Sequence, residues 1–258
     1  MIATPSPATR LAETGLTTAA GAALGGAVGL LGGVPLAIAA GASAGLNGAL
    51  GGYRRVYDWR SAKGWFAFAS DSTWGLLGVT LGNVLNLANA ARRGTGYRAD
   101  FSHRQNRHVF ERGACMKRGF AFTHGNVISN AATGREALVE ERRSFIDRHE
   151  GLHVWQNRIF GPIYQAVYVV WFTGGALVGA ATWALKREKP KMKRLVETAA
   201  YYDNPFEFWA YKRDEHWESN SADPTLKWRR PRWLKGKAPA DDRSAETHRP
   251  APTHEETR

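Results

Sequence analysis

The sequence predicts a mainly helical α+β protein that contains a small β-hairpin or sheet. Two uncharged apolar runs, residues 14–53 and 159–185, are long enough to form extended helices. Residues 108–130 lie between them, are rich in Val, Phe and Ile, and are punctuated by glycines, which favours a strand–turn–strand unit. We therefore expect an N-terminal helical hairpin followed by a mixed domain over residues 54–222.

The first apolar run has the composition of a membrane hairpin. Residues 1–13 precede it as a lead that we expect to be disordered. A membrane-spanning helix needs about 20 apolar residues, so residues 14–53 suffice for two, with a turn at Gly32–Pro35. Glycines at four-residue spacing form the pattern of a glycine zipper and favour a homo-oligomer through these helices (Gly21, Gly25, Gly29, Gly33). The alternatives are a signal peptide, whose apolar core is shorter, and a flexible Gly/Ala-rich segment.

The clearest helix prediction begins near Thr133 and ends at Gly161–Pro162. Helical residues four apart lie on one face, so His149 and His153 can present two imidazoles to one metal ion. Glu150 projects beside them, where a carboxylate can act on a metal-bound water. The alternative is a pair of ordinary buried histidines, each with its own hydrogen-bond partner.

The segment "HEGLHVWQ" resembles the active-site helix of zincin metallopeptidases, and "NPFEFWAY" is similar to the downstream segment that supplies a glutamate ligand in several such families. The resemblance covers residues 138–217. It implies a zincin-like domain with bound Zn²⁺, with His149, His153 and Glu207 as ligands and Glu150 as general base. The order of apolar and metal-binding segments is also similar to integral-membrane peptidases of the prenyl-protein-processing type. The whole chain further resembles glycine-zipper membrane proteins of actinobacteria, which implies no particular chemistry.

The chain departs from the thermolysin-like pattern after the glutamate. Those enzymes have an aspartate four residues later, where this sequence has Tyr211, a candidate catalytic residue for stabilising the developing oxyanion. Asp214 is a candidate partner for a ligand histidine, and His216 is a further oxyanion candidate. The alternatives are an interfacial tyrosine and a solvated aspartate. Three earlier histidines lack a tight metal spacing and are expected in ordinary surface or core positions (His103, His108, His124).

The second apolar run imposes a topological constraint. His153 precedes it and Glu207 follows it, so a single membrane crossing would place these ligands on opposite sides of the bilayer. Two crossings need about 40 residues, which is more than residues 159–185 provide. We therefore expect a bent, re-entrant or interfacial helical hairpin broken at Gly174–Gly175, or a helix packed inside the protein. The rival is a plain transmembrane helix without a zinc site.

The charge distribution favours anionic partners. The formal net charge is +12, and basic residues adjoin aromatic ones over residues 53–65, as is typical of a membrane interface. We expect membrane lipids with anionic head groups as partners, a bacterial plasma-membrane location, and the metal domain on the cytoplasmic side. We expect residues 223–258 to form a basic, largely disordered tail. Nucleic-acid binding is not expected, because no nucleic-acid-binding fold is recognisable.

These observations favour an enzyme: a membrane-associated zinc metallopeptidase that hydrolyses protein or peptide substrates, with Glu150 as general base. If residues 116–130 contain an edge strand beside the site, that strand is suited to binding an extended peptide. The alternative from another class is a non-catalytic glycine-zipper membrane scaffold with a structural or degenerate zincin site.

Overall fold

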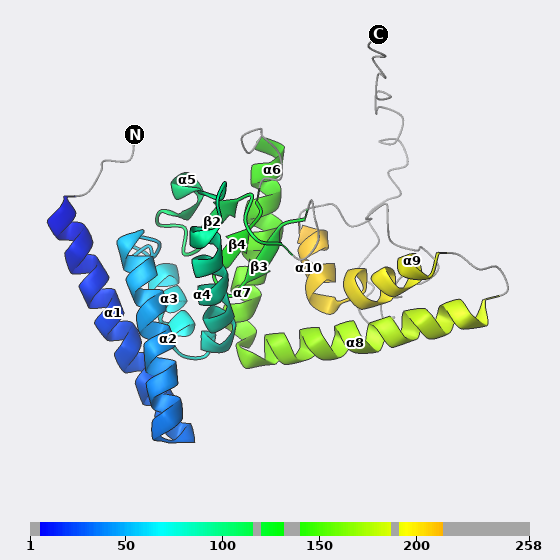
Figure 1. Ribbon diagram of the computed structural model, residues 1–258, viewed down its shortest axis with the longest axis horizontal. Coiled ribbons are helices and arrows are strands. Elements are labelled where there is room, and N and C mark those ends of the chain that lie inside the picture. Colours follow the sequence, from blue (N-terminus) through cyan, green and yellow to red (C-terminus); the bar gives the residue numbers. More distant parts are fainter. Residues whose placement is uncertain (1–5, 116–119, 132–139, 187–190, 214–258) are drawn as a thin grey trace, which may run out of the picture.

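The structure is a computed structural model that describes residues 6–115, 120–131, 140–186 and 191–213 (Figure 1). It is mainly helical with one four-stranded sheet, which confirms the predicted α+β class. The elements in chain order are α1 (Pro7–Gly29), η1 (Leu30–Gly32), α2 (Val34–Tyr53), α3 (Ala62–Ser72), α4 (Leu76–Ala91), β1 (Gly96–Tyr97), α5 (Ala99–Ser102), β2 (His108–Glu111), β3 (Phe122–His124), β4 (Val127–Ser129), α6 (Glu140–Phe145), η2 (Ile146–Glu150), α7 (Gly151–Phe160), α8 (Pro162–Leu185), α9 (Met192–Glu197), η3 (Thr198–Tyr202) and α10 (Pro205–Arg213).

Helices α1 and α2 form a closely packed antiparallel hairpin (Figure 1). A Cβ atom on Gly21 would lie 2.5 Å from the carbonyl oxygen of Ala44, so the approach of the two helices requires glycine there. The turn uses Gly33, whose φ of 93° favours glycine. The hairpin starts earlier than expected, because α1 is helical from Pro7 and the hydroxyl of Ser6 caps it. The lead expected over residues 1–13 is therefore helical from residue 7 onward.

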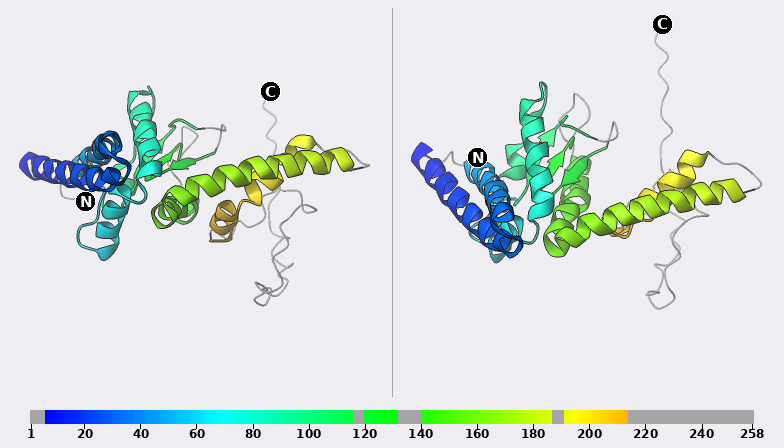
Figure 2. Two further views of the ribbon diagram at one scale, coloured as in Figure 1. Left: turned by 90° about the horizontal axis from the view of Figure 1, so that it is seen from below. Right: turned by 60° about the horizontal axis from the view of Figure 1, so that its bottom comes forward.

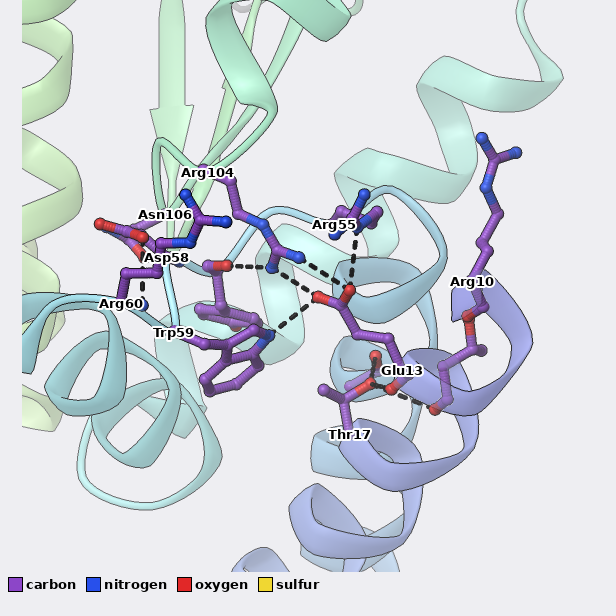
Figure 3. Close-up of polar contacts among 12 residues, drawn as sticks. Arg10, Glu13, Thr17, Arg55, Asp58, Trp59, Arg60, Arg104 and Asn106 are labelled. Atoms are coloured by element: carbon purple, nitrogen blue, oxygen red, sulfur yellow. Dashed lines mark hydrogen bonds and ion pairs between the residues drawn. The ribbon is translucent and has the colours of Figure 1, made fainter. Parts of the chain in front are cut away.

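A polar cluster around Glu13 joins the open end of the hairpin to the rest of the protein (Figure 3). The Glu13 carboxylate accepts hydrogen bonds from Arg55 Nε at 3.0 Å, Trp59 Nε1 at 2.8 Å and Arg104 Nη2 at 2.8 Å. Charged donors make such bonds stronger than neutral ones. The cluster therefore holds the first turns of α1 against the segment after α2 and the loop after α5.

The sheet has the strand order β1-β2-β4-β3. The β3–β4 hairpin turns at Gly125, whose φ is 55°, and β2 pairs in parallel with β4 through His108 and Val127. The expected strands within residues 108–130 are present, but the tight hairpin joins the second and third of them. The short strand β1 has no counterpart in the prediction, since two residues are too few to show a pattern. Within the described residues, β3 is an edge strand.

A buried polar chain connects the hairpin to the helix α7. Arg158 of α7 and Asp71 of α3 are both fully buried and form a salt bridge of 2.8 Å. The Asp71 carboxylate also accepts hydrogen bonds from Tyr57 Oη at 2.9 Å and Asn126 Nδ2 at 3.1 Å. Asn47 of α2 donates to the same Tyr57 oxygen at 2.8 Å. Because each buried polar group depends on its neighbours, the chain fixes α2, α3, α7 and the sheet relative to one another.

Helix α8 is continuous, so the expected break at Gly174–Gly175 is wrong. It is not packed inside the protein either, because only Tyr164 and Gly179 of its residues are buried. Gly175 instead permits close packing: a Cβ there would lie 2.3 Å from the carbonyl oxygen of Ala199 in η3. Helix α9 and η3 run back along α8 (Figure 1), which returns the chain to the side of α7 without a second long helix.

Three described segments are long and apolar enough to cross a membrane, by length and composition alone: Pro7–Gly32, Val34–Tyr53 and Pro162–Leu185. The expected membrane-compatible runs are therefore helical, with boundaries close to those predicted. The tail over residues 223–258 lies outside the described residues.

Candidate metal centre

The structure brings His149, His153 and Glu207 together. The two histidines lie on the continuous helical segment formed by η2 and α7, and Glu207 lies in the first turn of α10. Asn204 starts that helix by accepting a hydrogen bond from the Phe206 amide at 3.0 Å, as expected of the Asn-Pro pair. The predicted helix start at Thr133 lies outside the described residues.

The three side chains are close enough to hold one metal ion between them. His149 Nε2 lies 3.5 Å from Glu207 Oε2, and His153 Nε2 lies 3.5 Å from Glu207 Oε1. The three ligand atoms all lie within 4.8 Å of one another. Zinc–ligand bonds of about 2.0–2.2 Å in a tetrahedron separate neighbouring ligand atoms by about 3.3–3.6 Å. Glu207 Oε2 is buried and faces His149 Nε2, so a cation between these two atoms would have both as ligands.

Gln156 orients one of the two imidazoles. Its Oε1 atom lies 2.7 Å from Nδ1 of His153, and its Nε2 atom donates to the carbonyl oxygen of Phe206 at 3.1 Å. The second bond fixes which way the amide points, so Oε1 faces the imidazole as the acceptor. His153 then carries its proton on Nδ1 and leaves the Nε2 lone pair free for a metal.

The candidate ligand residues shift one another's pKa values. Burial alone would lower the pKa of His153, but the charge and hydrogen bond of Glu207 outweigh burial and raise that pKa. Burial alone would raise the pKa of Glu207, but His153 and His149 hold it well below its ordinary range. Glu207 is therefore ionised over the ordinary pH range, which is the form a cation requires. Tyr168 of α8 donates to Glu207 Oε1 at 2.9 Å and orients this carboxylate.

Glu150 lies beside the ligands and is 5% exposed. Its Oε2 atom accepts a hydrogen bond of 2.5 Å from the hydroxyl of Thr123, which is the middle residue of the edge strand β3. The condition set for residues 116–130 is thus met by β3, an edge strand among the described residues that contacts Glu150. The bond holds the carboxylate in one orientation and links it to the strand edge where an extended peptide can pair.

Aromatic side chains enclose His149. The ring of Tyr211 meets it edge-to-face at a centroid distance of 4.5 Å, and Phe145 stacks on it at 4.7 Å. Burial, aided by the charge of Glu207, raises the pKa of Tyr211, so its phenol stays protonated and able to donate. Tyr211 is therefore at the site, whereas its role toward an oxyanion remains a prediction.

The other candidate residues do not join the centre. His103, His108 and His124 are not in the described cluster of metal-ligating side chains. His108 is buried beside Arg54, and burial lowers its pKa well below the ordinary value. Asp214 and His216 lie outside the described residues. The role predicted for Asp214 therefore stays a prediction, while Gln156 is the described residue that orients His153.

Sequence reasoning missed three supporting residues and two local backbone features. Gln156 lies three residues after His153, a helical spacing that could have indicated contact. Thr123 and Tyr168 come from distant segments and carry no local signal. The segments Ile146–Glu150 and Thr198–Tyr202 are π-helical turns, a rare form that frequently occurs at functional sites. Comparisons of the chain with protein-family models, curated proteins and solved structures find no match.

Proposed function

We propose that this protein is a membrane-associated zinc metallopeptidase. His149, His153 and Glu207 would hold the zinc, and Glu150 would be the general base. The observation that carries the proposal is the convergence of two imidazoles and one carboxylate, with a second buried carboxylate adjacent in sequence. Three protein ligands leave a fourth tetrahedral position for water or substrate, which is the arrangement of catalytic rather than structural zinc.

The chemistry assigns a task to each side chain. Zinc, when bound, polarises a carbonyl and lowers the pKa of water at its open position. Glu150 takes a proton from the attacking water and delivers it to the leaving amine, so hydrolysis yields a carboxylate and an amine. Thr123 holds Glu150 in place, and the edge of β3 supports an extended peptide or protein substrate. Tyr211 donates to the developing oxyanion.

The membrane setting of this proposal comes from the three long apolar helices. Their exposed apolar side chains and the basic residues near their ends favour a bilayer with anionic head groups. By the positive-inside tendency, the metal domain would lie on the cytoplasmic side of a plasma membrane.

A non-catalytic membrane scaffold with glycine-zipper helices is the second candidate. One observation favours it: the three ligand residues and Glu150 are at most 6% exposed, and closed sites are typical of structural metals. The two candidates differ in what Glu150 does, because this residue is needed for hydrolysis and not for holding the metal.

Purified full-length protein tests this difference. Glu150→Gln should retain zinc, measured by elemental analysis, and should lower hydrolysis of a fluorogenic peptide library by at least about 10²-fold, the scale of general acid–base catalysis. His153→Ala should lose both zinc and hydrolysis, whereas the matched control His103→Ala should lose neither. If Glu150→Gln hydrolyses peptides at the wild-type rate, Glu150 is not the general base and the proposed mechanism fails. If wild type binds zinc but hydrolyses no peptide, the scaffold is supported instead. If wild type binds no zinc, the metallopeptidase fails and only a scaffold with a degenerate site remains.

A further inference from the structure

The exposed apolar surface comes from three segments that carry almost no charge. Residues 14–53, 64–91 and 159–185 contain a single charged residue, Asp71. Asp71 is fully buried against Arg158, so these segments expose no charge at all. In Figure 1 the closed end of the hairpin and helix α8 form the lower boundary of the ribbon, and the view from below in Figure 2 shows both on one face.

The closed end of the hairpin projects free of the protein. Ser43 of α2 contacts Thr80 and Asn83 of α4, and it is the hairpin residue nearest the turn with a described hydrogen bond to the rest of the chain. Beyond it, seven large apolar side chains are exposed (Leu24, Val28, Leu30, Leu31, Val34, Leu36, Ile38). About ten residues per arm, at 1.5 Å each, reach about 15 Å. That depth matches one leaflet, which is half of a hydrocarbon core of about 30 Å.

Helix α8 has protein on one face and no cover on the other. Its inner face contacts the protein along its length, through Tyr168 to Glu207 and through Gly175 to η3. Its outer face exposes apolar side chains from end to end, including Val169, Val170, Leu177, Val178 and Leu185. With protein on one side only, the outer face of α8 can lie against lipid along its whole length, as the apolar face of a helix in the plane of the interface does.

Cations lie near the end of the same helix. Lys191, Lys193 and Arg194 are exposed on and before α9, which packs against the C-terminal half of α8 on its inner face. With α8 parallel to the membrane surface, its outer face reaches the acyl chains while these cations remain at the level of anionic phosphates. In this orientation the apolar face lies at the depth of the acyl chains and the cations lie at the depth of the phosphates.

We propose that the closed end of the hairpin and the outer face of α8 insert together into a single leaflet of an anionic bilayer, with α8 parallel to its surface. The attachment is monotopic, and no described helix crosses the membrane. The candidate metal centre then lies outside the hydrocarbon, one tyrosine side chain away from the lipid-facing helix. This geometry goes beyond the proposed function, since it holds with or without bound zinc and without hydrolysis.

Depth-resolved fluorescence of the full-length chain tests the proposal. Cys115 is the sole cysteine, so Cys115→Ser provides a background for single labels. An environment-sensitive dye would be placed at Leu31→Cys, Val170→Cys or, as a matched control on the charged end of α4, Arg92→Cys. With vesicles of phosphatidylcholine and phosphatidylglycerol, the Leu31 and Val170 labels should shift to the blue and the Arg92 label should not. Quenchers deep in the acyl chains should act most on Leu31, and shallow quenchers most on Val170.

Several results would overturn the proposal. Quenching of the Leu31 label by an aqueous quencher trapped inside the vesicles would show that the hairpin crosses the bilayer. If deep quenchers act on the Val170 label as strongly as on the Leu31 label, α8 spans the bilayer. If vesicles cause no shift of either label, the surface does not bind lipid. If the labels are already shifted to the blue without vesicles and the protein has twice the monomer mass, a second copy of the chain covers the surface. Photoactivatable lipids added to the unmodified protein give a check without substitutions: reactive groups at the chain ends should modify residues 24–38 and groups near the phosphate should modify residues 163–185.

Discussion

Replacing Gln156 by leucine tests the orientation of the metal centre. In the structure, Gln156 accepts the Nδ1 proton of His153 and is itself anchored to the carbonyl of Phe206. In the metal-free Gln156→Leu variant at alkaline pH, the neutral imidazole of His153 can carry its proton on Nε2 instead, where Glu207 accepts it. The leucine therefore costs the metal-free form little stability. Metal binding uses Nε2 and moves the proton to Nδ1, where leucine offers no acceptor. The penalty therefore falls on the metal-bound form.

The size of this penalty follows from the burial of the centre. A buried N–H without an acceptor costs about 1–3 kcal/mol. Since 1.4 kcal/mol corresponds to a factor of ten, zinc affinity should fall by about 5-fold to 150-fold. The hydroxyl of Tyr164 lies 3.4 Å from the same Nδ1 atom and can take over part of the acceptor role. We therefore expect a loss near the lower end, about tenfold.

Competition with a zinc chelator at alkaline pH measures this affinity. Gln165→Leu is the matched control, because Gln165 bonds to Asn157 away from the ligands and its loss should leave zinc affinity unchanged. Gln156→Glu keeps an acceptor for His153 and should bind zinc within a few-fold of wild type. Wild-type affinity in Gln156→Leu, with the fold intact by circular dichroism, would refute the assigned role of Gln156.

Two further predictions concern packing and pH. Gly175→Ala should lower the free energy of unfolding by about 1–3 kcal/mol in urea titrations, because its Cβ would meet a backbone oxygen at 2.3 Å. A Cβ at Gly174 would meet only open space, so Gly174→Ala should not destabilise the protein. Equal effects of the two substitutions would contradict the close packing of α8 against η3. The pKa of His153 is raised in the folded state by Glu207, so the pairing of these two residues stabilises the metal-free protein. This stabilisation is complete below the unfolded pKa of about 6.5 and is lost as the pH rises through the higher folded pKa. Zinc affinity should rise over the same interval as the competing proton leaves; a pH-independent affinity and stability would contradict this coupling.

Local patterns were sufficient for much of the fold. The charge-free run with its central Gly-Pro turn predicted the hairpin, and Gly161–Pro162 marked the end of α7 correctly. The predicted break at Gly174–Gly175 was wrong because a glycine pair can mark either a helix break or a close contact between helices. Only the position of η3 shows that Gly175 makes a close contact. Asp71 is the one charged residue in the apolar segment 64–91, and its partner Arg158 is 87 residues away, so the sequence does not reveal the pairing.

The candidate site was predictable where it depends on helical spacing. His149 and His153 follow from the four-residue period, whereas Glu207 came from the resemblance of "NPFEFWAY" to a ligand-bearing segment. Tyr168 was not foreseen as a contact of Glu207, because the path of residues 159–185 was left open between a hairpin broken at Gly174–Gly175 and a helix packed inside the protein. Such contacts depend on how α8, α9 and α10 fold back, which is a tertiary property.

The buried polar chain from Asn47 to Arg158 has a consequence for dissection of this protein. Asn47 belongs to the hairpin, and its partner Tyr57 is hydrogen-bonded to the same Asp71 that holds Arg158 of α7, the helix of the candidate ligand His153. Deleting the hairpin would strip one hydrogen-bond partner from Tyr57 and expose the packed face of α4. The hairpin is therefore not a detachable appendage of an independently folded domain that carries the candidate centre. Anchor and candidate centre should melt in one cooperative transition, and truncation should yield unfolded chains rather than a soluble version of the protein.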